Sequence, residues 1–307
     1  MKKVFLLTAW LSVYATVQAQ RQVQVEYINY GDLIGVITDF VKVADTILWK
    51  QSMNSLRTSA SSLKEDIPVQ IPGVSMAPQK KELKDEQIFS KRKSSVTVVG
   101  RLRRVSGTNI NLEVMGTGFF ISKEGYCITN RHVLQDLLQK KADDNDLVYF
   151  VITEDKKVYP LEKLLCYSLN NDLAIFSLIS NGRYFTPIPL GKPAIVGAPV
   201  YCISHPAGEL YCFSKGMVTR NVSRDITTLG TAFSSAGKTP IRMEISADYG
   251  GGSSGGPVID RCGNLVGIIA TTNTIFLHEQ TGGAATAQPQ MVIKSTIPVK
   301  ALTDLLK

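Results

Sequence analysis

The spacing of apolar and polar residues changes twice along the chain and divides it into three parts. Lys2 and Lys3 precede a mostly apolar run over residues 4–13, and small residues follow at 17–19. This order of charged, apolar and small residues is typical of a secretory signal peptide. The run is shorter than the roughly 20 apolar residues that a membrane-spanning helix needs. We therefore expect residues 1–19 to be a cleaved signal peptide, and the mature chain to be exported, periplasmic or secreted, without a stable membrane anchor.

The second part, residues 20–94, is expected to hold one helix and a linker. Between Asp32 and Leu48 apolar residues recur at steps of three and four, which predicts an amphipathic helix. From Gln51 to about Ser95 the sequence is polar and contains three prolines, which predicts a mostly irregular linker. The helix would serve self-association or pack on the rest of the protein. We expect this part to be removable without loss of the folded core.

From Ser95 onward, short runs of β-branched and aromatic residues alternate with glycines and polar turns. Many strands of this length at this spacing predict an all-β sandwich or barrel. Two helical stretches interrupt them, from His132 to Lys140 and from Val299 to Leu306. We therefore expect residues 95–307 to form one all-β domain that closes with a C-terminal helix.

The stretch DYGGGSSGGPVID, residues 248–260, places five glycines and two serines in the seven positions from 250 to 256. Three motifs fit it: the dinucleotide-binding G-x-G-x-x-G, the G-x-S-x-G of α/β-hydrolases and the G-x-S-G-G-P of trypsin-like peptidases. The first two require a helix directly after the motif. Here Pro257 and an apolar strand follow, and His278 is the one histidine downstream of Ser254. The context therefore favours the third motif.

A histidine and an aspartate lie upstream of this serine, each beside a predicted strand. His132 follows a strand in YCITNRHVL, and Asp172 precedes one in NNDLAIFSL. The order histidine, aspartate, serine is that of the chymotrypsin-type triad. Ser254 is thus the candidate nucleophile, His132 the base that accepts its proton, and Asp172 the carboxylate that orients His132.

Taken with these residues, the chain resembles the trypsin-like serine peptidases, and their Deg/HtrA branch more than the digestive one. The matching segments are GTGFFIS, YCITNRHV, NDLAIFSL, YCISHPAG with SKGMVT, GGSSGGPVID and IPVKALTDLL, in this order. The resemblance implies two six-stranded β-barrels with the active site between them, and no cofactor. It assigns the backbone N–H groups of Gly252 and Ser254 to the oxyanion hole. Because the sequence ends directly after the closing helix, we expect no PDZ domain.

The same resemblance leaves two substrate preferences open. Asp248 lies six residues before Ser254, where a trypsin-like pocket carries the acidic group that binds a basic side chain. The Deg/HtrA branch has an aspartate nearby for structural reasons and prefers small apolar residues. Ile268, Ile269 and Ala270, the predicted pocket strand, favour an apolar lining.

Composition and charge indicate which classes of ligand the chain does not bind. The chain is 44% hydrophobic and 20% charged, as in folded globular proteins. Its net charge of +8 falls to +6 without the two signal-peptide lysines (8 − 2), and no long block of like charges predicts nucleic-acid binding. Three histidines and no paired Cys-x-x-Cys spacing predict no metal site. Of the five cysteines, Cys202 and Cys212 lie on two runs of a predicted hairpin that could bring them together.

The sequence therefore predicts an exported serine endopeptidase that cleaves proteins or peptides through an acyl-enzyme. The alternative is a catalytically silent protein of the same fold that binds extended peptides.

Overall fold

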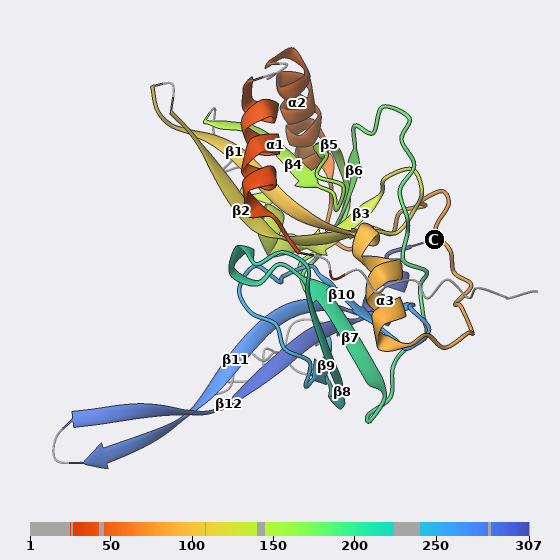
Figure 1. The fold of residues 1–307 in the computed structure, drawn as a ribbon, viewed down its shortest axis with the longest axis vertical. Coiled ribbons are helices and arrows are strands. Elements are labelled where there is room, and N and C mark those ends of the chain that lie inside the picture. The colour runs from red at the N-terminus through yellow and green to blue at the C-terminus, as the bar shows by residue number, and fades with distance from the viewer. Residues whose placement is uncertain are drawn as a thin grey trace, which may run out of the picture.

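The computed structural model describes residues 25, 27–42, 46–107, 109–139, 145–223, 240–281 and 284–306. Within these ranges the chain forms two closed barrels of six antiparallel strands, one above the other in Figure 1. This architecture confirms the two-barrel all-β fold that the sequence predicts. The expected signal peptide lies outside the described residues.

The first barrel joins its strands in the order β1-β2-β3-β6-β5-β4. Alternate residues of β6 serve two cores: Ala174 and Phe176 lie in the core of this barrel, and Leu173 and Ile175 pack with residues of the second. A short turn, η2 (Arg131–Leu134), and α4 (Gln135–Leu138) follow β3. The strands are β1 (Val96–Ser106), β2 (Asn109–Phe120), β3 (Cys127–Asn130), β4 (Asp146–Ile152), β5 (Val158–Ser168) and β6 (Leu173–Leu178).

The second barrel joins its strands in the order β10-β11-β12-β9-β8-β7. β11 and β12 are much longer than their neighbours and project from the barrel as a two-stranded ribbon (Figure 1). Helix α5 (Val299–Thr303) follows β12 where the sequence predicts the closing helix. The strands are β7 (Pro199–Ser204), β8 (Cys212–Ser223), β9 (Ile241–Ile245), β10 (Pro257–Ile259), β11 (Leu265–Thr281) and β12 (Ala284–Pro298).

The N-terminal part differs from the expectation of one helix followed by a linker. It forms α1 (Tyr30–Lys42), α2 (Thr46–Ser62) and later α3 (Asp85–Arg92). The serines that suggested a linker belong to α2, and two serines of this helix bond β5. The Ser52 hydroxyl donates to the Leu161 carbonyl at 2.6 Å, and the Leu164 N–H donates to the Ser59 hydroxyl at 3.0 Å. These bonds attach the polar residues of α2 to the first barrel.

Residues 63–84 contain no long helix or strand, yet they are bound to the second barrel. The Val69 N–H donates to the Leu305 carbonyl, and the Leu83 N–H donates to the Arg261 carbonyl, both at 2.9 Å. The Asn264 side chain bonds the Gln79 backbone twice, at 2.7 and 2.9 Å. These bonds make the segment a strap along the barrel.

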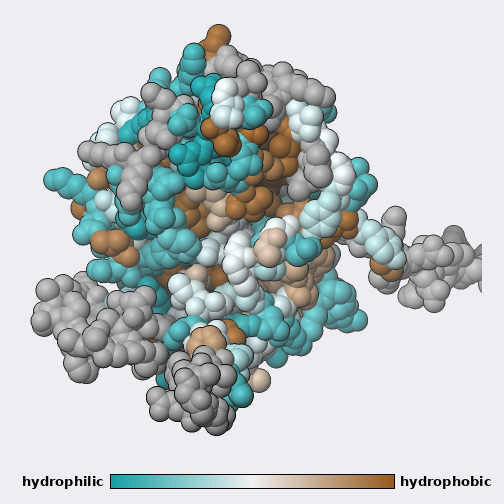
Figure 2. All heavy atoms as spheres, turned by 90° about the vertical axis from the view of Figure 1, so that its left-hand side faces the viewer, coloured by the Kyte–Doolittle hydropathy of each residue, from teal (hydrophilic) through white to brown (hydrophobic). Residues whose placement is uncertain are grey.

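Figure 2 shows the side of the molecule toward which the ribbon projects. Apolar side chains gather in the upper half of this face, the half of the first barrel, and hydrophilic side chains surround them. None of the described helices is both long enough and apolar enough to cross a bilayer.

Candidate active site

The pairing of β3 with β6 brings His132 and Asp172 together. Asn130 is paired with Leu173 at the end of both strands, so the residues next to this pair meet. The Asp172 carboxylate oxygen Oδ2 lies 2.7 Å from His132 Nδ1, and Oδ1 accepts the His132 backbone N–H at 2.9 Å. Two contacts to one carboxylate fix the orientation of the imidazole ring. The His132 side chain remains 40% exposed.

Asp172 itself is held in an unusual backbone conformation. Its φ of 56° lies in the left-handed region, which few residues other than glycine adopt. The Asp172 carbonyl accepts the Asn130 side-chain amide and the Arg131 backbone N–H, both at 3.0 Å. Such conformations persist where surrounding contacts enforce them, and they concentrate at functional sites.

Ser254 lies in the turn before β10 and contacts the first barrel. Its carbonyl accepts the Thr117 N–H at 2.9 Å, and its hydroxyl donates to the Ala270 carbonyl at 3.4 Å. A Cβ on Gly116 would lie 3.0 Å from the Ser254 carbonyl oxygen and 2.9 Å from Val133, the residue after His132. Within the described residues, no hydrogen bond joins the Ser254 hydroxyl to the His132 ring. Such bonds are often loose without substrate and tighten in the reactive complex.

The two adjacent serines have different surroundings. Ser253 is fully buried, and its hydroxyl accepts the Ser204 hydroxyl at 3.0 Å and the Gly250 N–H at 3.3 Å. Ser254 is only half-buried. Ser253 is therefore engaged in holding the turn, and Ser254 has a hydroxyl that solvent and substrate can reach.

Two of the glycines around these serines are required by the backbone. Gly252 has φ 89°, and a Cβ there would lie 2.6 Å from the His205 carbonyl oxygen. Gly255 has φ 85°, and a Cβ there would overlap the Thr117 carbonyl oxygen and the Thr129 hydroxyl. Both positions combine a left-handed conformation with close contact to a neighbouring backbone, which only glycine tolerates.

The backbone ahead of Ser254 is oriented by two further hydrogen bonds. The Gly251 carbonyl accepts the Ala207 N–H at 2.6 Å, and the Gly252 carbonyl accepts the Thr117 hydroxyl at 2.9 Å. Because C=O and N–H of a trans peptide point in opposite directions, the first bond turns the Gly252 N–H away from Ala207. In the described part of the chain, the N–H groups of Gly252 and Ser254 donate to no protein acceptor. Two such donors beside a serine can bind a developing oxyanion.

Ala207 and Thr117 were not among the predicted site residues. Thr117 lies in GTGFFIS, a segment that resembles the family but does not indicate the hydrogen bond between Thr117 and Gly252. Ala207 has φ 52°, and no feature of its sequence surroundings signals its bond to Gly251.

The turn that carries Ala207 is built on a buried histidine. His205 is completely buried, and its Nδ1 accepts the Tyr211 N–H at 3.0 Å. The His205 and Tyr211 rings meet edge to face with centroids 4.8 Å apart. Burial lowers the pKa of His205 to about 3, so the ring is neutral near pH 7. His205 therefore fixes the turn rather than exchanging protons.

The predicted pocket residues fall into two groups. Ile268, Ile269 and Ala270 are all buried in the hydrophobic cores, and the Ala270 carbonyl also accepts the Ser254 hydroxyl. The Asp248 side chain is 90% exposed and forms an ion pair with Lys294 of β12. The Lys294 ammonium also lies over the Tyr249 ring, 5.8 Å from its centroid. Nothing in the sequence around Lys294 signals this pairing.

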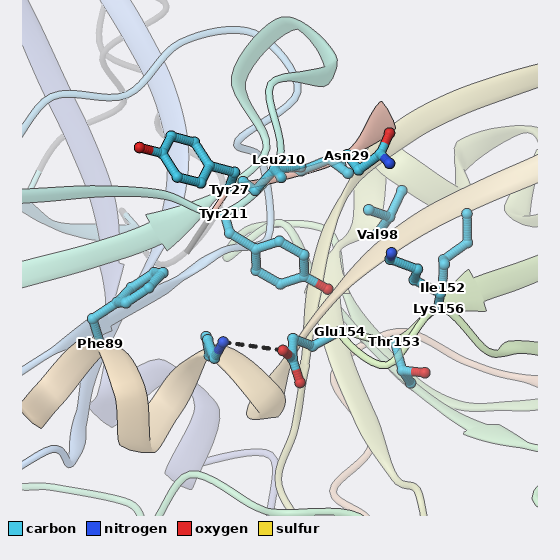
Figure 3. A pocket seen from close by; sticks show the side chains of 12 residues that line it. Tyr27, Asn29, Phe89, Val98, Ile152, Thr153, Glu154, Lys156, Leu210 and Tyr211 are labelled. Carbon is cyan, nitrogen blue, oxygen red and sulfur yellow. Dashed lines mark ion pairs between the residues drawn. The ribbon is translucent and has the colours of Figure 1, made fainter. Parts of the chain in front are cut away.

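A cavity of about 330 Å³ lies apart from His132, Asp172 and Ser254. It is lined by the N-terminal segment, the end of β4 and the turn before β8. Figure 3 shows the Tyr211 ring among these side chains and the ion pair of Lys93 with Glu154, whose atoms are 3.1 Å apart. None of the three candidate catalytic residues lines it.

The cysteines and acidic residues form no further centre in the described ranges. All five thiols are free, and the register places Cys212 opposite Ser204 and Cys202 opposite Ser214. The hairpin thus forms, but its two cysteines are not opposite each other. Among the described residues, no cluster of three or more His, Cys, Asp or Glu side chains is arranged to hold a metal ion.

Comparison with known proteins relates the chain to a peptidase domain. Residues 116–268 match the protein family described as "Trypsin-like peptidase domain". The chain is 27% identical over 194 residues to Protease Do-like 5, chloroplastic, of Arabidopsis thaliana, covering 62% of this chain and 58% of that protein. It is 30% identical over 186 residues to the probable periplasmic serine endoprotease DegP-like of Brucella suis, covering 59% of this chain and 32% of that protein. The match thus spans less than two thirds of the length of either relative.

Solved structures of the same fold include the HtrA-type protease AlgW with decapeptide and Deg5. The first gives a TM-score of 0.52 at 18% identity over 72% of this chain and 66% of that chain. The second gives 0.50 at 21% identity over 73% of this chain and 94% of that chain. The chain contains a trypsin-like peptidase domain, and its relatives are proteases of the Deg/HtrA type.

Proposed function

We propose that the protein is a serine endopeptidase whose catalytic residues are Ser254, His132 and Asp172. Its proposed nucleophile, the Ser254 oxygen, attacks the substrate carbonyl carbon while its proton passes to His132 Nε2. His132 then gives this proton to the leaving amine as the C–N bond breaks, which leaves an acyl group on Ser254. A water molecule then attacks the acyl carbon while its proton passes to His132. The acid product leaves as His132 returns this proton to Ser254.

The single observation that carries the proposal is the double contact between Asp172 and His132. Because the Asp172 carboxylate can only accept a hydrogen bond, the neutral His132 ring carries its proton on Nδ1. Nε2 is then free to accept the proton of Ser254. The same carboxylate stabilises the imidazolium that forms when Ser254 loses its proton. The second contact, from the His132 N–H, prevents the pair from separating by rotation.

The unpaired N–H groups of Gly252 and Ser254 are the proposed oxyanion hole. Support for this comes from the bond between the Ala207 N–H and the Gly251 carbonyl, which turns the Gly252 N–H away from Ala207. A preorganised donor of this kind is worth on the order of 3 to 4 kcal/mol in the transition state.

The proposed substrates are extended segments of proteins or peptides, and the proposed location is outside the cytoplasm. An AlgW structure, which shares the fold, contains a decapeptide. Relatives named as periplasmic support export, as does the predicted signal peptide, whereas other relatives are named as chloroplastic.

An organophosphonate probe tests the proposed chemistry directly. We expect stoichiometric covalent labelling of the folded protein, with the modified residue located at Ser254 by mass spectrometry. A folded protein that binds extended peptides but takes up no probe would instead be the catalytically silent binder.

The ion pair between Asp248 and Lys294 gives an expectation for specificity. Because the Lys294 ammonium neutralises Asp248, we expect peptides with valine before the scissile bond to be cleaved better than peptides with arginine. Lys294→Met frees the carboxylate and should raise the relative rate for arginine on the order of tenfold. Comparing kcat/KM for the two peptides measures the change.

Lys300→Met is the matched control, because Lys300 is an exposed lysine that pairs with Asp304 away from this site. It should leave the ratio of the two rates unchanged. A wild-type preference for arginine, or a ratio unaffected by Lys294→Met, would show that the pair does not set specificity.

A further inference from the structure

The turn that joins β7 to β8, residues 205–211, is bonded to the loop of Ser254 and to helix α1. We call it the β7–β8 turn. Its backbone N–H groups from 207 to 211 all have acceptors, and two of these acceptors lie outside the turn. The Ala207 N–H donates to the Gly251 carbonyl at 2.6 Å, and the Leu210 N–H donates to the Tyr30 hydroxyl at 2.9 Å. The other three bonds lie within the turn and run from Gly208 and Tyr211 to His205 and from Glu209 to Pro206.

The backbone of the β7–β8 turn has an uncommon conformation. Ala207 and Tyr211 have φ of 52° and 54°, and Gly208 between them has φ of 83°. Residues other than glycine keep such left-handed conformations only where surrounding contacts enforce them. The buried His205 ring supplies one of these contacts, and the two bonds that leave the turn supply the others. Loss of an outer bond therefore allows the turn to relax.

The Tyr30 hydroxyl holds the turn in two ways at once. Its oxygen accepts the Leu210 N–H, and its hydrogen donates to the Glu209 carboxylate at 2.7 Å. A phenol can donate and accept at the same time. Figure 3 shows Leu210 beside Asn29, the residue before Tyr30.

Helix α1 gives Tyr30 a fixed position on the first barrel. Ile37 of α1 packs in a hydrophobic cluster with β1, with β4 and with Leu210 of the turn. The Phe40 ring also contacts Phe150 of β4, with ring centroids 5.6 Å apart. The turn leaves the second barrel, and Tyr30 binds it from the first.

We propose that Tyr30 is a positioning residue of the oxyanion hole. The inference rests on the proposed function, which assigns the Gly252 N–H to that hole. Tyr30 holds the β7–β8 turn, and Ala207 of this turn holds the Gly251 carbonyl. The same peptide group carries the Gly252 N–H, so its direction depends on the position of Ala207. Tyr30 acts only through these hydrogen bonds.

The expected effect falls on the transition state rather than on the bound substrate. An oxyanion hole binds the charge that develops during the reaction, and an interaction made only then changes kcat. A shift of the turn by a fraction of an ångström misaligns the Gly252 N–H. Removing the Tyr30 hydroxyl should therefore lower kcat and leave KM nearly unchanged.

Tyr30→Phe removes one oxygen atom and keeps the ring. We expect kcat for a peptide substrate to fall roughly three- to thirtyfold, with KM within about twofold, because one donor is misaligned but still present. A peptidyl trifluoromethyl ketone, whose adduct with Ser254 carries the oxyanion, should bind more weakly by the same factor. The corresponding alcohol forms no adduct and should bind both proteins equally. Titration of Ser254 with the organophosphonate counts the folded molecules to which the rates refer.

Tyr27→Phe is the matched control. Tyr27 precedes Tyr30 in the same segment and is 85% exposed, and within the described chain no hydrogen bond joins its hydroxyl to the β7–β8 turn. The control should match the wild type in kcat and in affinity for the ketone. The proposal is overturned by an unchanged kcat in Tyr30→Phe, by equal losses in both tyrosine variants, or by equal weakening of ketone and alcohol.

Two variants of Glu209 test the hydrogen bond separately from the charge. Glu209→Gln keeps an oxygen that can accept the Tyr30 hydroxyl, whereas Glu209→Ala removes it. We expect the glutamine variant to stay within about twofold of the wild-type kcat, and the alanine variant to fall roughly two- to tenfold. Equal losses in the two variants would show that the charge acts instead of the bond, and would count against the proposal.

Failure of the proposed function gives a different result. If the wild type takes up no probe at Ser254 and hydrolyses no peptide, the proposed function fails. If the wild type is labelled and active, and Tyr30→Phe matches it in kcat and in affinity for the ketone, only the positioning role of Tyr30 fails.

Discussion

Replacing Ser254 with alanine lowers peptide hydrolysis by roughly 10⁶-fold in kcat, the loss measured when a triad nucleophile is removed. The residual rate comes from positioning and from the N–H groups of the oxyanion hole, which the substitution leaves in place. Covalent labelling by an organophosphonate disappears completely, because no other residue receives the probe. Steady-state hydrolysis of a fluorogenic peptide and intact mass after labelling measure the two effects.

Ser253→Ala is the adjacent control. Its hydroxyl binds Ser204 and Gly250 inside the turn, so its loss should lower stability by about 1 kcal/mol and retain labelling of Ser254. Thermal unfolding measures the first effect. If the Ser253 variant lost labelling and hydrolysis while the Ser254 variant kept both, the nucleophile would be Ser253.

Removing residues 1–90 prevents the barrels from folding stably, in contrast to the expectation from sequence. Trp49, Met53 and Leu56 of α2 are buried, and Met53 and Leu56 belong to the core of the first barrel. Truncation exposes this core, frees the β5 groups that bind the α2 serines, and removes the strap of residues 63–84. We expect insoluble protein or loss of the cooperative thermal transition. A soluble, fully active chain starting at Lys91 would contradict this.

A point variant isolates the contribution of α2. Leu56→Ala leaves a cavity under the helix and should lower the free energy of unfolding by about 2 to 5 kcal/mol. Asn54→Ala, on the exposed side of the same helix, should change it by less than about 0.5 kcal/mol. Chemical denaturation of both variants gives the comparison.

The barrels and the neighbourhood of Ser254 were predictable because their signals are local. Short runs of β-branched residues favour strands, and GGSSGGP favours a turn in which Gly252 and Gly255 are required. His132 and Asp172 each border a strand, and pairing of those strands brings the two residues together. Antiparallel pairing of β3 with β6 therefore places His132 and Asp172 in contact, although they are far apart in the sequence.

What could not be predicted depends on contacts between distant segments. The serines of α2 suggested a linker, because the groups of β5 that bond Ser52 and Ser59 lie far away in the sequence. The burial of Ile268 and Ile269 in the hydrophobic cores depends on closure of the second barrel, which the sequence around them does not reveal. The neutralisation of Asp248 by Lys294 depends on the pairing of β11 with β12, which residue spacing does not reveal.

Two hydrogen bonds that Thr117 donates join the barrels at the candidate site. This residue belongs to β2, yet its N–H and hydroxyl hold the Ser254 and Gly252 carbonyls of the other barrel. The geometry around Ser254 is thus a property of the interface between two cooperative units, and reactivity requires alignment to a fraction of an ångström. Because each barrel is closed by its own strand pairing, we expect this pairing to survive when the interface loosens. We therefore expect mild denaturation to abolish hydrolysis before secondary structure is lost.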